Sequence, residues 1–186
     1  CGVCHTDISY LYDGVPTVHK GPLVLGHEIV GRVAGTDRTV IVPAVSPCGQ
    51  CAACKRGRRT ACSDSRMPGN HHDGGFATHV QVPERWLCPV PALFELPAWQ
   101  LSVIADAVTT PFQAVRRANL RAGSVAIIVG VGGVGGFLVQ LARAMGAFPV
   151  ALDVAEGPIA RAAQCGASIA INIRGLEPKA VRQEVT

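Results

Sequence analysis

The chain has 186 residues, of which 48% are hydrophobic and 16% are charged, and its formal net charge is +4. This composition excludes intrinsic disorder, which requires low hydrophobicity and high net charge. So small a charge indicates neither a nucleic-acid partner nor a membrane-surface partner. The length allows one large domain or two modest ones.

The first hundred residues have the pattern of a compact β domain followed by a junction. Short apolar runs separated by glycines predict short strands; these are Val24–Leu25, Ile29–Val30, Arg32–Val33, Thr39–Val42 and Phe76–Val82. Between them, residues 48–70 lose apolar periodicity and gain Cys, Gly and Arg, which indicates a segment organised by metal. A proline-rich passage from Pro83 to Pro97 then leads out of the domain. We therefore expect one domain over residues 1–100 and a second over 101–186.

The second half alternates helical and strand patterns. Helices are predicted over 101–108, 111–118, 137–145 and 159–164. Strands are predicted over 125–129, 150–153 and 168–173. Strands that alternate with helices form a parallel sheet with right-handed crossovers. One uncharged stretch, Ser124–Ala142, has the Gly-x-x-x-Gly spacing of a membrane helix, but its five glycines argue against a continuous helix, so we expect no membrane span.

A glycine-rich turn follows the first of these strands. Its sequence, Gly130-Val131-Gly132-Gly133-Val134-Gly135, matches G-x-G-x-x-G, and Asp153 ends the next strand 21 residues after Gly132. Glycines permit the tight turn and the close approach of a pyrophosphate, which the helix N-terminus attracts. A carboxylate at the end of the second strand accepts hydrogen bonds from ribose hydroxyls and repels a 2′-phosphate, which favours NAD over NADP. The alternative is a structural turn beside a surface aspartate.

Four of the eight cysteines lie close together, at Cys48, Cys51, Cys54 and Cys62. No signal-peptide pattern supports secretion, so we expect a cytoplasmic protein whose clustered thiols bind zinc. Four protein ligands leave no open position on the metal, so a zinc ion in this lobe, residues 48–62, would be structural. An iron–sulfur cluster is the competing interpretation.

A basic patch lies within the same lobe. It consists of Lys55, Arg56, Arg58 and Arg59. Its ordinary role is to keep the lobe solvated, and the alternative is contact with an anionic ligand or partner.

Two further motifs complete the pattern: Cys1-Gly-Val-Cys4-His5-Thr6-Asp7 and Gly26-His27-Glu28. With the cysteine lobe and the glycine turn, in this order, they resemble the zinc-dependent alcohol dehydrogenases of the medium-chain dehydrogenase/reductase family. The resemblance implies an α/β fold, with part of a GroES-like β-barrel catalytic domain and part of a Rossmann doubly wound parallel sheet. It also implies catalytic zinc, structural zinc and NAD as cofactors.

The resemblance assigns roles to these residues. Cys4 and His27 are similar to catalytic zinc ligands, and Glu28 to the carboxylate that approaches the metal. Asp7 is similar to the acceptor that fixes the His27 imidazole. His5 is similar to a residue that lies near the cofactor pyrophosphate. Thr6 is similar to the hydroxyl that takes the substrate's proton. Cys1 lies outside the ligand positions; the rival idea is a Cys1–Cys4 redox pair.

Two positions depart from the family pattern. The third ligand of the catalytic zinc is a cysteine in many members, and the corresponding position here is Asp106, whose oxygen can also bind zinc. Ser9 stands where many alcohol dehydrogenases have a histidine that completes the proton relay, so proton release needs Ser9, water or another route.

The aspartate variant narrows the resemblance to one subgroup. Segments 105–111, 67–70, 74–77 and 87–90 look like 6-hydroxycyclohex-1-ene-1-carbonyl-CoA dehydrogenases, which implies hydride transfer from a secondary alcohol of an acyl-CoA to NAD. The alternatives are a general zinc alcohol dehydrogenase, a zinc-free quinone reductase and an inactive zinc- and dinucleotide-binding fragment. Since the members of this family have longer chains, we expect these 186 residues to be a fragment with little activity of its own. At full length we expect a homo-oligomer.

Overall fold

The computed structural model of the protein describes residues 1–91 and 96–184. The chain divides into two compact units, Cys1–Asp106 and Ala107–Thr186. The division falls after Asp106, and not after residue 100, because the 3-10 helix η3 (Ser102–Ala105) contacts two strands of the first unit. The Ala44 amide also donates to the carbonyl of Ala105 over 3.3 Å. The segment that precedes Asp106 is thus held against the strands of the first unit.

The first unit contains an antiparallel three-stranded sheet in the order β1-β2-β3. The strands are β1 (Ile29–Arg32), β2 (Thr39–Val42) and β3 (Cys88–Pro89), and Ile29 pairs with Val42. Val40 and Val42 alternate with half-buried neighbours along β2, as expected of a strand with one face on the core. The strands predicted near residues 29–33 and 39–42 are confirmed, with the first two runs joined into one strand.

Two predicted strands of the first unit are wrong. Val24–Leu25 and Phe76–Val82 contain no strand. The two segments do meet, since the Gly74 amide donates to the Val24 carbonyl over 2.7 Å and the Phe76 amide to the Leu25 carbonyl over 3.0 Å. Gly26, however, has a φ of +97°, which interrupts the extended backbone that a ladder needs.

The helices of the first unit are short. They are α1 (His5–Tyr12), α2 (Ala52–Lys55), α3 (Ala98–Leu101), η1 (Arg59–Ala61), η2 (Glu84–Trp86) and η3. Helix α1 was not predicted. The helix predicted over 101–108 is instead α3 followed by η3, and it ends because Asp106, with φ −138° and ψ −63°, leaves the helical conformation.

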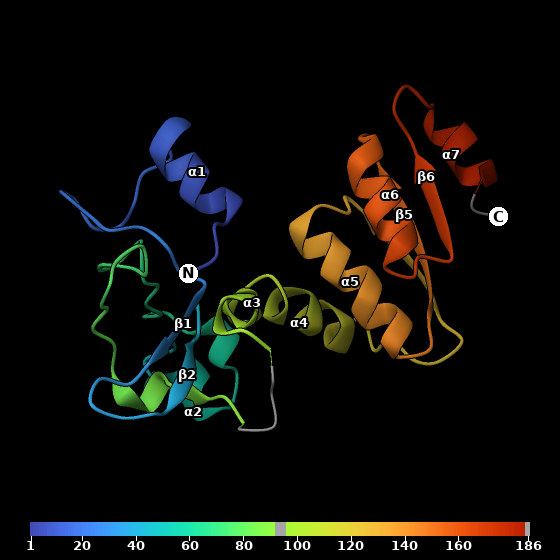
Figure 1. The fold of residues 1–186 in the computed structure, drawn as a ribbon. Coiled ribbons are helices and arrows are strands. Elements are labelled where there is room, and N and C mark those ends of the chain that lie inside the picture. Colours follow the sequence, from blue (N-terminus) through green and yellow to red (C-terminus); the bar gives the residue numbers. More distant parts are fainter. Residues whose placement is uncertain (92–95, 185–186) are drawn as a thin grey trace. The chain divides into compact units, whose positions relative to one another are not determined.

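The second unit contains a parallel sheet in the order β4-β5-β6, which confirms the predicted sheet type. Its strands are β4 (Val125–Val129), β5 (Phe148–Asp153) and β6 (Ile169–Asn172), and its helices are α4 (Thr109–Arg117), α5 (Gly133–Ala144), α6 (Glu156–Gln164) and α7 (Pro178–Glu184). Figure 1 shows α5 and α6 side by side next to the strands. Between them lies a core that includes Ile128, Val139, Ala151 and Ile159.

Helix α5 begins at Gly133, four residues before the predicted start at Phe137. The low helix propensity of glycine predicts no helix at residues 133–136, but the packing of α5 against the end of β4 places the start of the helix there. A Cβ atom at Gly135 would overlap the carbonyl oxygen of Gly130, so only glycine lets the helix approach the end of β4 so closely. Within the described residues, no helix has both the length and the apolar character needed to cross a membrane.

Candidate functional site

Helix α1 positions the first part of a buried polar cluster. Cys4 caps the helix, and its backbone amide donates to Oδ2 of Asp7 over 3.0 Å. Asp7 is only 1% exposed, and its other oxygen, Oδ1, accepts from the Gly26 amide over 3.1 Å. One buried carboxylate therefore ties the start of α1 to the residue before His27.

His27 stands at the centre of the cluster, directly before Glu28 and β1. Its Nδ1 lies 3.4 Å from Asp7 Oδ1, and its Nε2 lies 3.4 Å from Asp106 Oδ2. Ligand atoms of Cys4, His27 and Asp106 all lie within 4.8 Å of one another. The structure thus brings together the three residues predicted as catalytic zinc ligands, all from the first unit.

The chemistry of this cluster fits a metal ion. Both ring nitrogens of His27 are buried without a well-formed hydrogen bond, although carboxylates lie near each. Sulfur, imidazole nitrogen and carboxylate oxygen are the ligands that zinc takes in proteins. Burial lowers the pKa of His27, but Asp106, Asp7 and Cys4 outweigh it and raise that pKa to about 9. The anionic surroundings of the imidazole therefore favour a cation.

The other residues predicted for this site lie around it. The Thr6 hydroxyl accepts from Cys4 Sγ over 3.6 Å. Ser9 is half-buried on α1, while His5 is exposed on the same helix. Glu28 is 3% exposed but is not one of the three clustered ligand residues. The structure thus places Thr6 beside a candidate ligand and leaves the role assigned to Glu28 a prediction.

The four lobe cysteines form a second candidate metal site. The sulfur atoms of Cys48, Cys51, Cys54 and Cys62 lie within 4.8 Å of one another. Backbone amides point at three of them: Cys48 N at Cys62 Sγ (3.3 Å), Cys51 N at Cys48 Sγ (3.4 Å) and Cys54 N at Cys51 Sγ (3.5 Å). Such donors stabilise thiolates; those of Cys54 and Ser63 lower the pKa of Cys51 to about 6. Burial raises the pKa of the Cys54 thiol to about 12, a cost that a bound cation would offset.

The glycine turn of the second unit lies where its motif predicts, between β4 and α5. Gly130 has a φ of +82°, and Gly132 caps the helix that contains Gly133, Val134 and Gly135. Asp153, at the carboxyl end of β5, accepts from the Val131 amide over 2.8 Å and the Ala155 amide over 3.0 Å. These amides lower the pKa of Asp153. A fixed anionic carboxylate therefore lies directly beside the turn.

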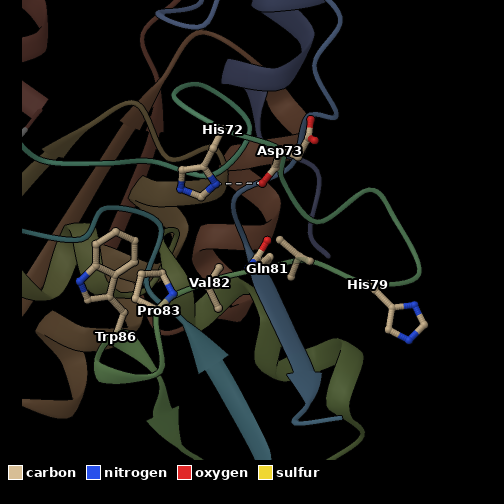
Figure 2. Close-up of a pocket in the computed structure, with 8 residues that line it drawn as sticks. His72, Asp73, His79, Gln81, Val82, Pro83 and Trp86 are labelled. Atoms are coloured by element: carbon tan, nitrogen blue, oxygen red, sulfur yellow. Dashed lines mark hydrogen bonds between the residues drawn. The ribbon is translucent and has the colours of Figure 1, made fainter.

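A cavity of about 550 Å³ in the first unit involves none of the predicted site residues. Its lining includes His72, Asp73, His79 and Trp86. Figure 2 shows the His72 ring turned toward the backbone of Asp73, while His79 points away from the other side chains. The cavity thus shares no lining residue with the Cys4, His27 and Asp106 cluster, which remains the candidate site.

Some of the hydrogen bonds that hold this cluster in place were not predicted from the sequence. The bond from Gly26 to Asp7 was not foreseen, although the three-residue spacing of Cys4 and Asp7 is that of a capping pair at the start of a helix. Asn70 and Asp73 bind the amides of Val18 and Val24 in the segment that leads to His27, and the sequence assigned neither of them a role at this site.

Comparison with known proteins gives consistent matches. The family described as "Alcohol dehydrogenase GroES-like domain" matches residues 1–92. An alcohol dehydrogenase of Geobacillus stearothermophilus is 34% identical over 100% of this chain and 57% of its own length. An uncharacterized zinc-type alcohol dehydrogenase-like protein of Haemophilus influenzae is 33% identical over 92% of this chain and 52% of its own length. The chain therefore spans little more than half the length of these relatives.

Solved structures agree in fold and differ in cofactor. Acetophenone reductase from Geotrichum candidum, in complex with NAD, superposes with a TM-score of 0.83 at 32% identity, covering 95% of this chain and 55% of that one. A protein of Sinorhizobium meliloti described as a zinc-binding dehydrogenase, bound to NADP, superposes with a TM-score of 0.82 at 28% identity, covering 92% and 52%. The chain thus shares the fold of these dehydrogenases.

Proposed function

The chain belongs to the zinc-type medium-chain alcohol dehydrogenase family, and on this premise we propose that it is the part of an NAD-dependent alcohol dehydrogenase that carries the catalytic zinc ligands Cys4, His27 and Asp106. The proposal rests on the convergence of three zinc-type donors within 4.8 Å, with two nitrogens of a buried histidine lacking well-formed hydrogen bonds. Three protein ligands leave a fourth position open to substrate.

The first unit's own residues would then hold the metal and handle the substrate proton. Bound zinc supplies a Lewis acid that lowers the pKa of an alcohol. Asp7, 3.4 Å from Nδ1 of His27, would orient the ring so that Nε2 faces Asp106. The Thr6 hydroxyl, 3.6 Å from Cys4 Sγ, lies close enough to the ligands to accept the alcohol proton and pass it to Ser9 or to water.

In the second unit, we propose that the turn from Gly130 to Gly135 binds the NAD pyrophosphate and that Asp153 selects NAD. The Asp153 carboxylate would accept hydrogen bonds from the ribose hydroxyls and repel the phosphate of NADP. With two backbone amides already bound to it, Asp153 is held in one orientation beside the turn.

Asp153→Asn is expected to improve the affinity for NADP relative to NAD by about tenfold, which corresponds to about 1.4 kcal/mol. The amide removes the negative charge but keeps an oxygen that can accept from the turn. Dissociation constants of both nucleotides, measured by fluorescence titration, check the shift. Asp37→Asn, at an exposed carboxylate of the other unit, is the control. An unchanged NADP to NAD ratio in Asp153→Asn would show that this carboxylate does not select the cofactor.

For the substrate, we propose a ring alcohol on a CoA thioester, of the 6-hydroxycyclohex-1-ene-1-carbonyl-CoA type. Support comes from the segment around Asp106 and from the basic patch of the lobe, whose four side chains are all exposed. A simple secondary alcohol is the second candidate, favoured by relatives that are named alcohol dehydrogenases.

Turnover by the whole protein separates these two substrates. We expect kcat/KM for the CoA thioester to exceed that for cyclohexanol, and the advantage to fall when Lys55 and Arg56 are changed to Ala, because the patch would contact the CoA phosphates. Equal use of cyclohexanol would favour the general alcohol dehydrogenase.

A further inference from the structure

The two ligands Cys4 and His27 are joined by a segment that has no regular structure. Helix α1 ends at Tyr12, and residues 13–26, called the linker below, contain neither helix nor strand. Many of the linker's side chains are exposed. An irregular segment fixes its ends only if other parts of the fold hold it, since its backbone has many accessible conformations.

Loop 67–76 is the part of the fold that holds the linker, and it is itself tightly bonded. The Gly69 amide donates to the His72 carbonyl over 2.7 Å, the His71 amide to the Met67 carbonyl over 2.9 Å, and the Met67 amide to the His71 ring over 3.3 Å. His72 Nδ1 lies 3.1 Å from the backbone oxygen of Asp73, the contact drawn in Figure 2. The loop thus provides a fixed frame.

Two side chains of this loop bind linker amides. Asn70 Oδ1 accepts from the Val18 amide over 2.8 Å, and Asp73 Oδ1 accepts from the Val24 amide over 2.9 Å. Next to them the two backbones are in contact, because the Gly75 amide donates to the Gly26 carbonyl over 2.8 Å. A Cβ at Gly69 would lie 2.7 Å from the Gly26 nitrogen, so the loop and the linker fit without space between them.

We propose that Asn70 and Asp73 are positioning residues for the metal centre: by holding the linker at Val18 and Val24, they fix the backbone from which His27 reaches Cys4 and Asp106. Asp7 holds Gly26 from one side, and loop 67–76 holds it from the other. This inference rests on the proposed metal site. Partners that orient a ligand without touching the metal commonly change metal affinity by about 10- to 100-fold.

The test is zinc affinity, measured separately for the two sites of the chain. The protein is titrated with a competing chelator, and zinc release is followed with a colorimetric indicator. The release phase that is missing from the titration of Asp106→Ala belongs to the His27 site. Asn70→Ala/Asp73→Ala is expected to weaken that site about tenfold and to leave the cysteine lobe unchanged. Asn70→Asp/Asp73→Asn keeps both acceptor oxygens and the net charge, so it should restore wild-type affinity. Asp37→Ala, in an exposed 3.8 Å pair with Arg32, is the control.

Each outcome of this titration decides one question. A selective weakening in the alanine variant, with recovery in the exchanged variant, supports the inference. Unchanged affinity in the alanine variant, or equal weakening of both zinc sites, overturns it, since general loss of stability would affect both. A wild-type chain without the Asp106-dependent phase would instead contradict the proposed metal site itself.

Discussion

Asp106→Ala is expected to lower alcohol-dependent NAD reduction by the whole protein about a thousandfold or more. The carboxylate lies 3.4 Å from His27 Nε2 and is one of three donors within 4.8 Å of one another. Removing it leaves two protein ligands, too few for the zinc sites known in enzymes. Lewis-acid activation is worth several kcal/mol, and each 1.36 kcal/mol is a factor of ten in rate.

Two companion variants make this result specific. Asp106→Cys places a thiolate, also a zinc ligand, at the same position, so it should retain much more activity than Asp106→Ala. Asp37→Ala removes an exposed carboxylate of the same unit and should leave kcat/KM unchanged. If Asp106→Ala had wild-type turnover, Asp106 would not be a ligand and the proposed reaction centre would be wrong.

Cys54→Ser is expected to remove the zinc ion of the lobe and to lower the melting temperature by about 10 °C or more, because structural zinc contributes directly to folding free energy. The Cys54 side chain is 8% exposed, and its sulfur lies within 4.8 Å of the other three. Residues 48–62 contain only short helical turns, α2 and η1, so little besides the metal orders them.

Cys88→Ser is the matched control, since Cys88 is an exposed cysteine of the same unit outside both clusters. It should keep the zinc content and the melting temperature of the wild type. Elemental analysis also tests the competing iron–sulfur interpretation: iron and acid-labile sulfide in the wild-type protein would exclude structural zinc in the lobe. An unchanged melting temperature in Cys54→Ser would show that the lobe folds without its metal.

The second unit could be predicted well from its sequence because its elements are long and periodic. The apolar run Val125–Val129 became β4 with the predicted bounds. The start of α5 could not be predicted, because the close contact of Gly135 with Gly130 overrides the poor helix propensity of glycine. The first unit was harder, since segment 76–82 has the composition of a strand but forms no ladder in the described structure.

The two metal sites differ in how far local spacing reveals them. The lobe cysteines lie within fifteen positions of one another, so their pattern alone predicts a shared metal. Cys4, His27 and Asp106 are far apart in sequence, and only a family resemblance joined them before the fold was known. The support from Asn70 and Asp73 is invisible in sequence, because it consists of single hydrogen bonds to backbone amides some fifty positions away.

The zinc content per chain, measured by mass spectrometry of the metal in purified protein, tests the proposed metal centre most directly. We expect two zinc ions in the wild type, one in Asp106→Ala and two in Asp37→Ala. The ion that Asp106→Ala retains should be lost in Cys54→Ser instead. Two zinc ions in Asp106→Ala, or only one in the wild type, would contradict a metal centre formed by Cys4, His27 and Asp106.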